Sequence, residues 1–571
     1  MVQSMAPDLI VHNGNVVTVD AAFSISDAIA VQRDRIVGVG GAAAMLDAAA
    51  PHTHIIDLAG RTIVPGLIDG HAHMDREGLT ELYPSLRHAR SIDDILQIIE
   101  SLVADSEPGD WIVTMPLGAP PHYLGDPADI ADGRFPDRHD LDKVSPNNPV
   151  YIRPVWGYWR HDEVEPLVSV ANTMALEIAG ISRDTPAPCA TVVIDKDAQI
   201  GEPTGIFFED TLQPIVELTF MRNMTRFSRD QRIHGLKRSM EIYQSYATTS
   251  VFEGHGMAAE LIDVYKQVSA DGALSIRADM PLSPSWDTIA AADPGALFDT
   301  WAGWLSGDGL GDDHLRVSGL FMLAQAPAGS VHLTEDKLRG QVSPYTGWAS
   351  RYYDHALPRD TLIDTMVEAA RRDIRVATIT IPMLEILDEV NKIEPIVDKR
   401  WVLGHVGILT QEQVHRIRDL GLTTTTHTNR TIYSIGSKFR DELGPDRESD
   451  IMPLRRMVDA GTHFAFASDN VPVSLFHSFW QSVSRFDRKT GDRIAVDQKL
   501  TRQEALRAAT IDGAYLCKSE NDRGSIEVGK FADFSVLTDD PLSAPEDALM
   551  NIAAELTVIG GKIVYERGNE N

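Results

Sequence analysis

Eight short apolar segments dominate the middle of this 571-residue chain, and helical patterns lie between many of them. The segments have the length and composition of buried strands, and the stretches between them include amphipathic patterns at residues 360–372, 383–392 and 410–420. Alternation of strand and helix implies parallel pairing, and eight such units close a barrel. The sequence therefore predicts an α/β fold, a (β/α)8 TIM-type barrel with strands at residues 62–69, 249–253, 275–279, 315–322, 375–379, 401–404, 423–426 and 464–467.

Both ends of the chain are rich in predicted strands. Near the N-terminus these lie at residues 9–11, 16–19, 28–31, 35–39, 54–58 and 62–64, the last overlapping the first predicted barrel strand, and near the C-terminus at 534–537 and 556–565, with a Gly560-Gly561 turn. We expect the two ends to form one small β-sandwich domain from residues 1–61 and 523–571. Residues 62–522 would then form the barrel domain.

The connection between the first and second predicted barrel strands is far longer than an ordinary loop. It contains predicted helices at 92–106 and 171–179 and strand-like segments at 111–113 and 149–155. We expect a large insertion, over about residues 75–245, that covers the barrel mouth and contributes to substrate specificity. Its aromatic residues would either bind an apolar substrate group or pack within the insertion; they are Trp156, Tyr158, Trp159 and His161.

Composition limits the class of protein. The formal net charge is −31, which disfavours binding to nucleic acid or to anionic membranes, since both need a basic surface. The two cysteines, Cys189 and Cys517, make no disulfide framework or metal motif. No secretory leader and no apolar run long enough to cross a bilayer is visible. We expect a soluble cytoplasmic protein that acts on a small molecule.

The first predicted barrel strand runs directly into His71-Ala72-His73. Residues i and i+2 of a strand point to the same face, so both imidazoles would face the mouth at the strand's C-terminal end. Neutral imidazole is a good ligand for Zn, Fe, Ni or Mn. Chance spacing on a surface strand is the alternative, but the Pro-Gly-Leu-Ile-Asp-Gly lead-in favours a pair of metal ligands.

The segment Val-Pro-Gly-Leu-Ile-Asp-Gly-His-Ala-His at residues 64–73 resembles the first-strand metal motif of the amidohydrolase superfamily. Residues 201–206, 467–473, 500–510 and 524–533 resemble further parts of these proteins, so the resemblance spans nearly the whole chain. The long insertion points to the branch that includes the N-substituted formamide deformylases. The resemblance implies a metal-dependent hydrolase that acts on a C–N bond and assembles as a homo-oligomer, which we expect to be a dimer.

Two further site residues follow from this resemblance. Asp469 matches the eighth-strand aspartate, which in the family binds metal and serves as general base, although Ser-Asp-Asn is also typical of a helix N-cap. His405 matches the sixth-strand histidine, a metal ligand or an acid/base group. A structural histidine is the alternative for that position.

Two residues of the family pattern are missing. Residues 316–322 offer no lysine on the fourth strand, and residues 375–381 offer no histidine on the fifth. A standard binuclear site is therefore doubtful, and a mononuclear site built on His71, His73 and Asp469, with His405 as a further ligand, is the simplest interpretation. We expect one divalent ion per chain, Zn in the first place, with Mn, Fe or Ni as alternatives.

The second predicted strand ends in Glu253-Gly254-His255. Both side chains could reach the mouth and either replace the missing ligands or protonate the leaving group; a polar strand end bonded to backbone is the alternative. Weaker candidates are His427, Asn429, Asp279, Asp75, Arg76 and Glu77.

The resulting hypothesis is attack of a metal-activated water on an amide, N-substituted formamide or cyclic amide. Asp469 would take the proton of the water, and Asp469, Glu253 or His255 would return one to the leaving nitrogen. Two alternatives stay open. Two histidines and a carboxylate also match the ligands of non-haem iron oxygenases, and a chain that has lost its metal would be a binding protein.

Overall fold

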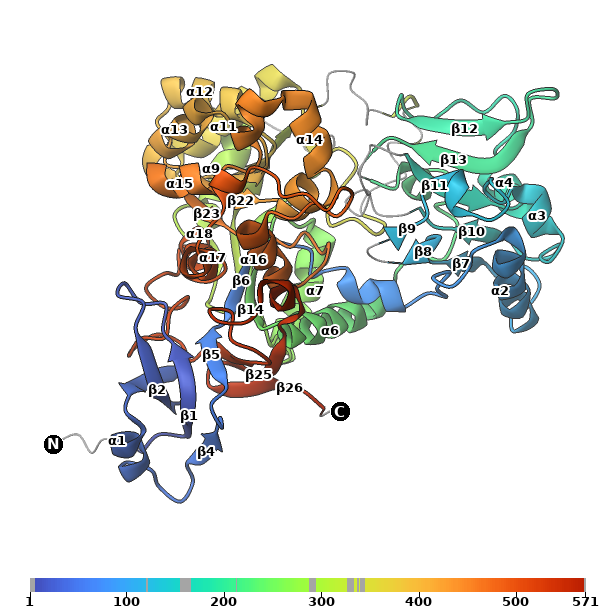
Figure 1. Cartoon of the computed structure of the whole chain (residues 1–571). Helices are drawn as coiled ribbons and strands as arrows, with labels where there is room; N and C mark the ends of the chain where they lie inside the picture. The colour runs from blue at the N-terminus through green and yellow to red at the C-terminus, as the bar shows by residue number, and fades with distance from the viewer. Residues whose placement is uncertain are drawn as a thin grey trace.

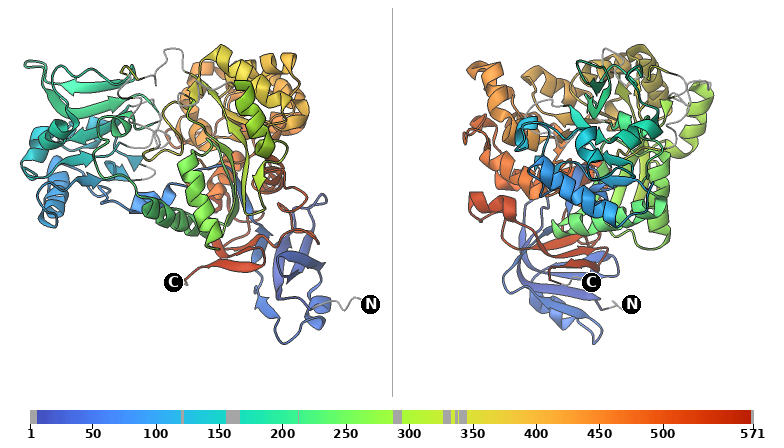
Figure 2. Two further views of the ribbon diagram at one scale, coloured as in Figure 1. Left: turned by 180° about the vertical axis from the view of Figure 1, so that it is seen from behind. Right: turned by 90° about the vertical axis from the view of Figure 1, so that its right-hand side faces the viewer.

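The protein consists of a central barrel, a lobe that projects to one side of it, and a sheet made by both ends of the chain (Figures 1 and 2). The computed structural model describes residues 6–119, 122–154, 166–211, 213–286, 294–325, 333–335, 338 and 345–568. No helix within these ranges combines the length and apolar character that a membrane span needs.

Eight parallel strands form the barrel, close to the predicted positions. The two end strands meet across glycine: the Gly70 N–H donates to Phe466 O (2.8 Å), and a Cβ on Gly70 would lie 2.8 Å from the Ala465 Cβ. The predicted (β/α)8 barrel is confirmed. Its strands are β6 (Leu67–Ala72), β14 (Thr248–Glu253), β15 (Arg277–Leu282), β17 (Leu315–Phe321), β20 (Val376–Ile379), β21 (Val402–Val406), β22 (Thr423–Thr426) and β23 (His463–Ala465).

Amphipathic helices pack against the outside of the barrel. In α12 the residues Met383, Leu384, Leu387 and Val390 are buried, the spacing of one helix face. The main helices are α6 (Arg229–Ser245), α7 (Ala259–Ala270), α9 (Pro294–Leu305), α11 (Arg359–Arg371), α12 (Met383–Ile393), α13 (Gln411–Asp419), α15 (Leu454–Ala460), α16 (Leu475–Ser484), α17 (Arg502–Ala508) and α18 (Ile511–Leu516).

Both chain ends enter one sheet, which we call the terminal sheet, with strand order β26-β25-β24-β5-β1-β2-β3 and β4 beside β1. The junction between the two ends is the antiparallel pairing of β24 with β5. The strands are β1 (Leu9–Val17), β2 (Ile25–Gln32), β3 (Arg35–Gly40), β4 (His54–Asp57), β5 (Thr62–Pro65), β24 (Phe534–Leu537), β25 (Ala554–Ile559) and β26 (Lys562–Glu566).

The segment expected to be one barrel strand, residues 62–69, is divided between two sheets. β5 belongs to the terminal sheet, and β6 begins the barrel after Gly66. A side chain at Gly66 would collide with Thr249, since a Cβ there would lie 2.1 Å from its Oγ1. The expectation of one continuous strand was wrong, because the apolar pattern of a segment does not show where the segment changes from one partner strand to another.

The insertion after β6 contains its own five-stranded sheet, in the order β12-β13-β11-β10-β7. This lobe projects to one side of the barrel in Figure 1 and in the left view of Figure 2. The aromatic cluster 156–161 falls outside the described residues. The elements of the lobe are α2 (Ile92–Ala104), β7 (Ile112–Thr114), α3 (Arg138–Asp142), β10 (Val150–Ile152), β11 (Leu167–Ala171), α4 (Thr173–Ala179), β12 (Val192–Lys196) and β13 (Pro203–Glu209).

Candidate metal centre

The end of β6 carries His71 and His73 into the barrel, where their exposed fractions are 1% and 3%. Below them Asp69 accepts hydrogen bonds from the N–H groups of His71 (3.0 Å) and Ser468 (3.1 Å). This carboxylate therefore ties the first strand to the loop after the eighth. His71 also lies against Gly254, where a Cβ would be 2.1 Å from its Nδ1, so only glycine fits there.

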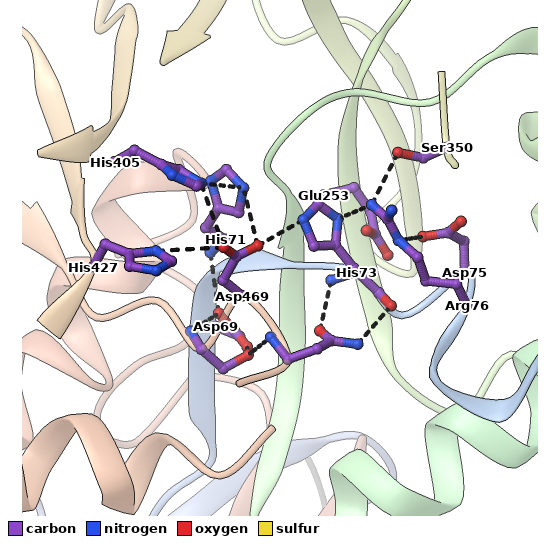
Figure 3. A network of polar contacts seen from close by, with 12 residues as sticks. Asp69, His71, His73, Asp75, Arg76, Glu253, Ser350, His405, His427 and Asp469 are labelled. Carbon is purple, nitrogen blue, oxygen red and sulfur yellow. Dashed lines mark hydrogen bonds and ion pairs between the residues drawn. The ribbon is translucent and has the colours of Figure 1, made fainter. Parts of the chain in front are cut away.

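Asp469 lies in the loop after β23, and its carboxylate faces the two histidines (Figure 3). Its Oδ1 is 2.8 Å from His73 Nε2 and 3.9 Å from His71 Nε2. The backbone holds it there: Asp469 has a positive φ of 51°, and its N–H donates to His71 O (3.0 Å). A non-glycine residue in this region costs about 1–3 kcal/mol and persists only where its surroundings enforce it, a pattern common at functional sites.

His405, in β21, completes a set of four donors. It too has a positive φ, 56°, and its Nε2 lies 3.1 Å from His71 Nε2 and 3.8 Å from Asp469 Oδ2. The predicted ligands His71, His73, His405 and Asp469 are thus brought together, and we call them the four-donor set. The four separations between these donor atoms given above run from 2.8 to 3.9 Å.

Part of the four-donor set fits a divalent metal ion: one donor atom each from His71, His405 and Asp469 lies within 4.8 Å of the other two. Ligand atoms about 2.1 Å from a tetrahedral Zn²⁺ lie about 3.4 Å from one another. His73 and His405 approach different oxygens of Asp469, Oδ1 and Oδ2. Burial lowers the pKa values of His71, His73 and His405 well below their usual range, so the three rings are neutral, the form in which imidazole binds metal. Neither oxygen of Asp469 accepts a hydrogen bond within the described part of the chain, although both are buried. A cation would satisfy them.

His255, two residues after β14, reaches the same place. Its ring centroid is 4.5 Å from that of His71, 4.8 Å from that of His73 and 5.1 Å from that of His405. One donor atom each from His71, His73 and His255 fit within 4.8 Å of one another. The structure therefore places this predicted candidate beside the four-donor set.

His427 lies closer to the centre than its weak ranking in the sequence suggested. It follows β22, its Nδ1 is 3.4 Å from Asp469 Oδ2, and its ring stacks on that of His405 with centroids 4.8 Å apart. Burial first, and Arg430 second, lower the pKa of His427 to about 3. Its position directly after a barrel strand was the only sequence feature that could have ranked it higher.

Glu253 lies beyond His73, away from Asp469. Its Oε1 accepts hydrogen bonds from the Met74 N–H (3.1 Å) and the Tyr265 hydroxyl (2.5 Å), and burial raises its pKa well above the usual range. Arg76 contacts His73 Nδ1, so the ring of His73 separates Asp469 from Arg76 (Figure 3).

Asn470, which the sequence analysis passed over, fixes the backbone of His73. Its Oδ1 accepts from the His73 N–H (3.1 Å) and the Tyr243 hydroxyl (2.5 Å), while its Nδ2 donates to His73 O (3.0 Å) and Glu77 Oε2 (2.8 Å). Its place next to Asp469 was the only available indication. Tyr243 and Tyr265, on α6 and α7, had none.

Two weaker candidates lie elsewhere. Asp279 is inside β15, not at its end, and accepts a hydrogen bond from Ser318 of β17. Burial raises its pKa, against the opposing effect of Arg375. Asn429 accepts a hydrogen bond from Gln481 (3.1 Å). Asp279 is therefore a partner of neighbouring strands and not part of the donor set.

Comparison with known proteins identifies the class. A model of the amidohydrolase family matches residues 54–565, so the chain belongs to this family. Together with the four-donor set, this membership supports a metal-dependent hydrolase.

Individual proteins show the same relationship. The chain is 26% identical to an N-substituted formamide deformylase of Arthrobacter pascens, over 98% of both chains, and 25% identical to a putative amidohydrolase of Bacillus subtilis, over 97% of this chain and 99% of the other. An uncharacterized metal-dependent hydrolase from Pyrococcus furiosus shares the fold, with a TM-score of 0.66 and 18% identity over 94% of this chain and 100% of its own.

Proposed function

We propose that this protein hydrolyses the C–N bond of a small amide-type substrate, with N-substituted formamides as the first class to test. The observation that carries the proposal is the convergence of His71, His73, His405 and Asp469, with donor separations of 2.8 to 3.9 Å, at the C-terminal ends of barrel strands. The similarity to a formamide deformylase along the full chain favours formamides over other amides.

Residues of the four-donor set would hold one divalent metal, with Zn²⁺ favoured by imidazole and carboxylate donors. Three protein ligands at a time, such as His71, His405 and Asp469, would leave a position for water, as catalytic zinc sites do. When bound, such an ion supplies Lewis acidity toward both a water molecule and a substrate carbonyl. The proton transfers would be carried out by residues of the chain.

Asp469 is the general base. Burial raises the pKa of Asp469 well above its usual range, although Arg76 opposes this shift, so the carboxylate is a better proton acceptor than an exposed aspartate. Its Oδ2 faces His427 Nδ1 (3.4 Å) and His405 Nε2 (3.8 Å). The backbone of Asp469, whose N–H donates to His71 O (3.0 Å), would keep the carboxylate in place while it takes a proton from water.

The same carboxyl group would return its proton to the leaving nitrogen. We prefer Asp469 to Glu253 for this step because His73 stands between Glu253 and the Asp469 carboxylate. His255, with its ring packed against His71 and His73, is placed to support those two ligands.

The test combines metal content with turnover. Protein purified without added metal is analysed for bound elements and assayed, with and without O₂, for release of formate and amine from N-substituted formamides. We expect about one metal ion per chain and hydrolysis independent of O₂. His71→Ala should lose the ion and lower kcat/KM more than about 100-fold, beyond the loss typical of a residue behind the ligands.

His52→Ala changes an exposed histidine and serves as the matched control. Turnover that requires O₂ would point to an iron oxygenase instead. A cyclic amide as the only substrate would move the proposal to another substrate class. Full activity in His71→Ala would contradict the metal-dependent mechanism.

A further inference from the structure

A second group of donors lies behind His73. Donor atoms of His73, Asp75 and Glu253 fit within 4.8 Å of one another, and we call these three residues the acidic cluster. Their exposed fractions are 3%, 3% and 1%. The Oε2 atom of Glu253 accepts no hydrogen bond within the described part of the chain, while Oε1 is held by Met74 N–H and Tyr265. By donor type this cluster would suit a second divalent ion.

A cation of the chain already occupies this position. The guanidinium of Arg76 contacts His73 Nδ1, its Nε lies 3.3 Å from Asp75 Oδ1, and its Nη2 donates to Ser350 Oγ (3.2 Å). Figure 3 shows the guanidinium between His73, Asp75 and Ser350. Arg76 is itself 3% exposed, so its charge acts in a medium that screens it weakly.

We propose that Arg76 is a built-in cation that fills the acidic cluster and limits this centre to one metal ion. The proposal rests on the proposed function, because it concerns the metal held by the four-donor set. Two buried carboxylates need a compensating positive charge, and a guanidinium bonded on three sides supplies one permanently. A divalent ion entering the cluster would meet this fixed charge at close range, so the cluster stays closed to metal.

Arg76 is thereby a positioning residue for His73. Because a guanidinium can only donate, its contact makes Nδ1 of His73 the acceptor and holds the ring with Nε2 2.8 Å from Asp469 Oδ1. The proton of the neutral ring then lies on Nε2, facing that carboxylate.

The experiment measures the number of zinc ions bound per chain. Wild-type protein and variants are saturated with ZnCl₂, freed of excess by gel filtration and analysed for zinc per chain, and circular dichroism checks the fold. We expect about one zinc in the wild type and about two in Arg76→Met, which keeps an unbranched, flexible side chain and removes the guanidinium and its charge. Arg76→Lys should stay near one, because a cation remains.

The location of the extra ion is tested by the double variant Arg76→Met/Glu253→Gln, which should return to one zinc. A folded Arg76→Met that still holds one zinc would overturn the inference. If Arg76→Met does not fold, Glu253→Gln is compared with the wild type. One zinc ion per chain in both proteins supports an acidic cluster without metal. Two zinc ions in the wild type and one in Glu253→Gln would show that the wild-type cluster binds metal.

The zinc counts distinguish a failure of the role proposed for Arg76 from a failure of the proposed hydrolase function. A wild type with one zinc, lost in His71→Ala, combined with no gain in Arg76→Met, leaves the hydrolase proposal intact and removes only the role of Arg76. A wild type that holds no zinc after saturation overturns both.

Discussion

At the metal centre, small residues that leave room for a neighbouring side chain matter as much as the residues that supply donor atoms. Gly254 separates two candidate residues, Glu253 and His255, and its missing side chain is the space in which the ring of His71 lies. A ligand position in a barrel thus depends on a small neighbour on the adjacent strand.

Gly254→Ala should displace His71, because the new Cβ would lie 2.1 Å from Nδ1 and the neighbouring atom belongs to a buried ring. We expect lower zinc occupancy and a loss of about 1–3 kcal/mol in the free energy of unfolding, as for overpacked sites. Elemental analysis and denaturant unfolding measure the two effects. Gly303→Ala, in α9 with no atom outside the helix backbone within 4 Å of the new Cβ, is the control. It should leave zinc occupancy unchanged and should not lower the free energy of unfolding, because alanine is the better helix former.

Glu77 gives a pH-dependent prediction. Burial raises the pKa of Glu77 from 4.5 to about 7, against the lowering effect of the Asn470 hydrogen bond. Because the folded pKa exceeds the unfolded one, its favourable contribution is complete below pH 4.5 and is lost as the pH rises through about 7.

Glu77→Gln should therefore raise the free energy of unfolding at pH 8 by about 1–3 kcal/mol and give no such gain at pH 4. The amide oxygen can still accept from Asn470, which limits other effects. Urea unfolding at both pH values measures the difference. Glu100→Gln, an exposed position of α2, should show no pH-dependent gain; an equal gain there would refute the explanation.

At the scale of elements, helix ends were easy to predict and strand partners were not. The predicted helix at 383–392 matches α12 within one residue, and that at 410–420 matches α13, which Thr410 and Gln413 start as a capping box. By contrast, Gly66 divides residues 62–69 between two sheets, and we propose that the domain boundary lies there instead of at residue 61.

Helix α6 offers a test at this scale. Ser228 Oγ accepts from the Gln231 N–H (3.1 Å), and Gln231 Oε1 accepts from the Ser228 N–H (2.9 Å). Ser228→Ala should lower the free energy of unfolding by about 1 kcal/mol and leave zinc content unchanged. Ser228→Asp retains a capping acceptor and should restore most of the loss. A loss of similar size in Ser228→Asp would show that the cap is not responsible. Denaturant unfolding measures both.

At the scale of the whole molecule, a bound metal ion should stabilise the fold by linking distant parts of the chain. The four-donor set joins the first, sixth and eighth barrel strands, so an ion bound there stabilises only the closed barrel. Bound ligand stabilises the native state by about 2.7 kcal/mol when its free concentration is 100 times Kd.

Removing the metal with a chelator should therefore lower Tm, and adding Zn²⁺ should restore it. Differential scanning fluorimetry of the chelated protein across a zinc titration measures the effect. His71→Ala should show little rise in Tm over the same titration, whereas His52→Ala should behave as wild type. An equal rise in His71→Ala would place the stabilising ion elsewhere.

The sequence by itself determined the barrel and the core of the site. Strand and helix patterns are local, because a buried face repeats every two residues in a strand and every 3.6 in a helix. The His71-Ala72-His73 spacing works through the same local geometry. Dimeric assembly and a cytoplasmic location stay predictions.

Only the tertiary structure decided which strand ends meet. His255 and His427 follow strands far from β6 in the chain, and closure of the barrel brings both to the four-donor set. It also decided that Arg76 turns inward to the acidic cluster, whereas the sequence pattern around it is equally compatible with a solvated loop. Side-chain direction in a loop depends on which cavity the rest of the chain encloses, and no local pattern contains that information.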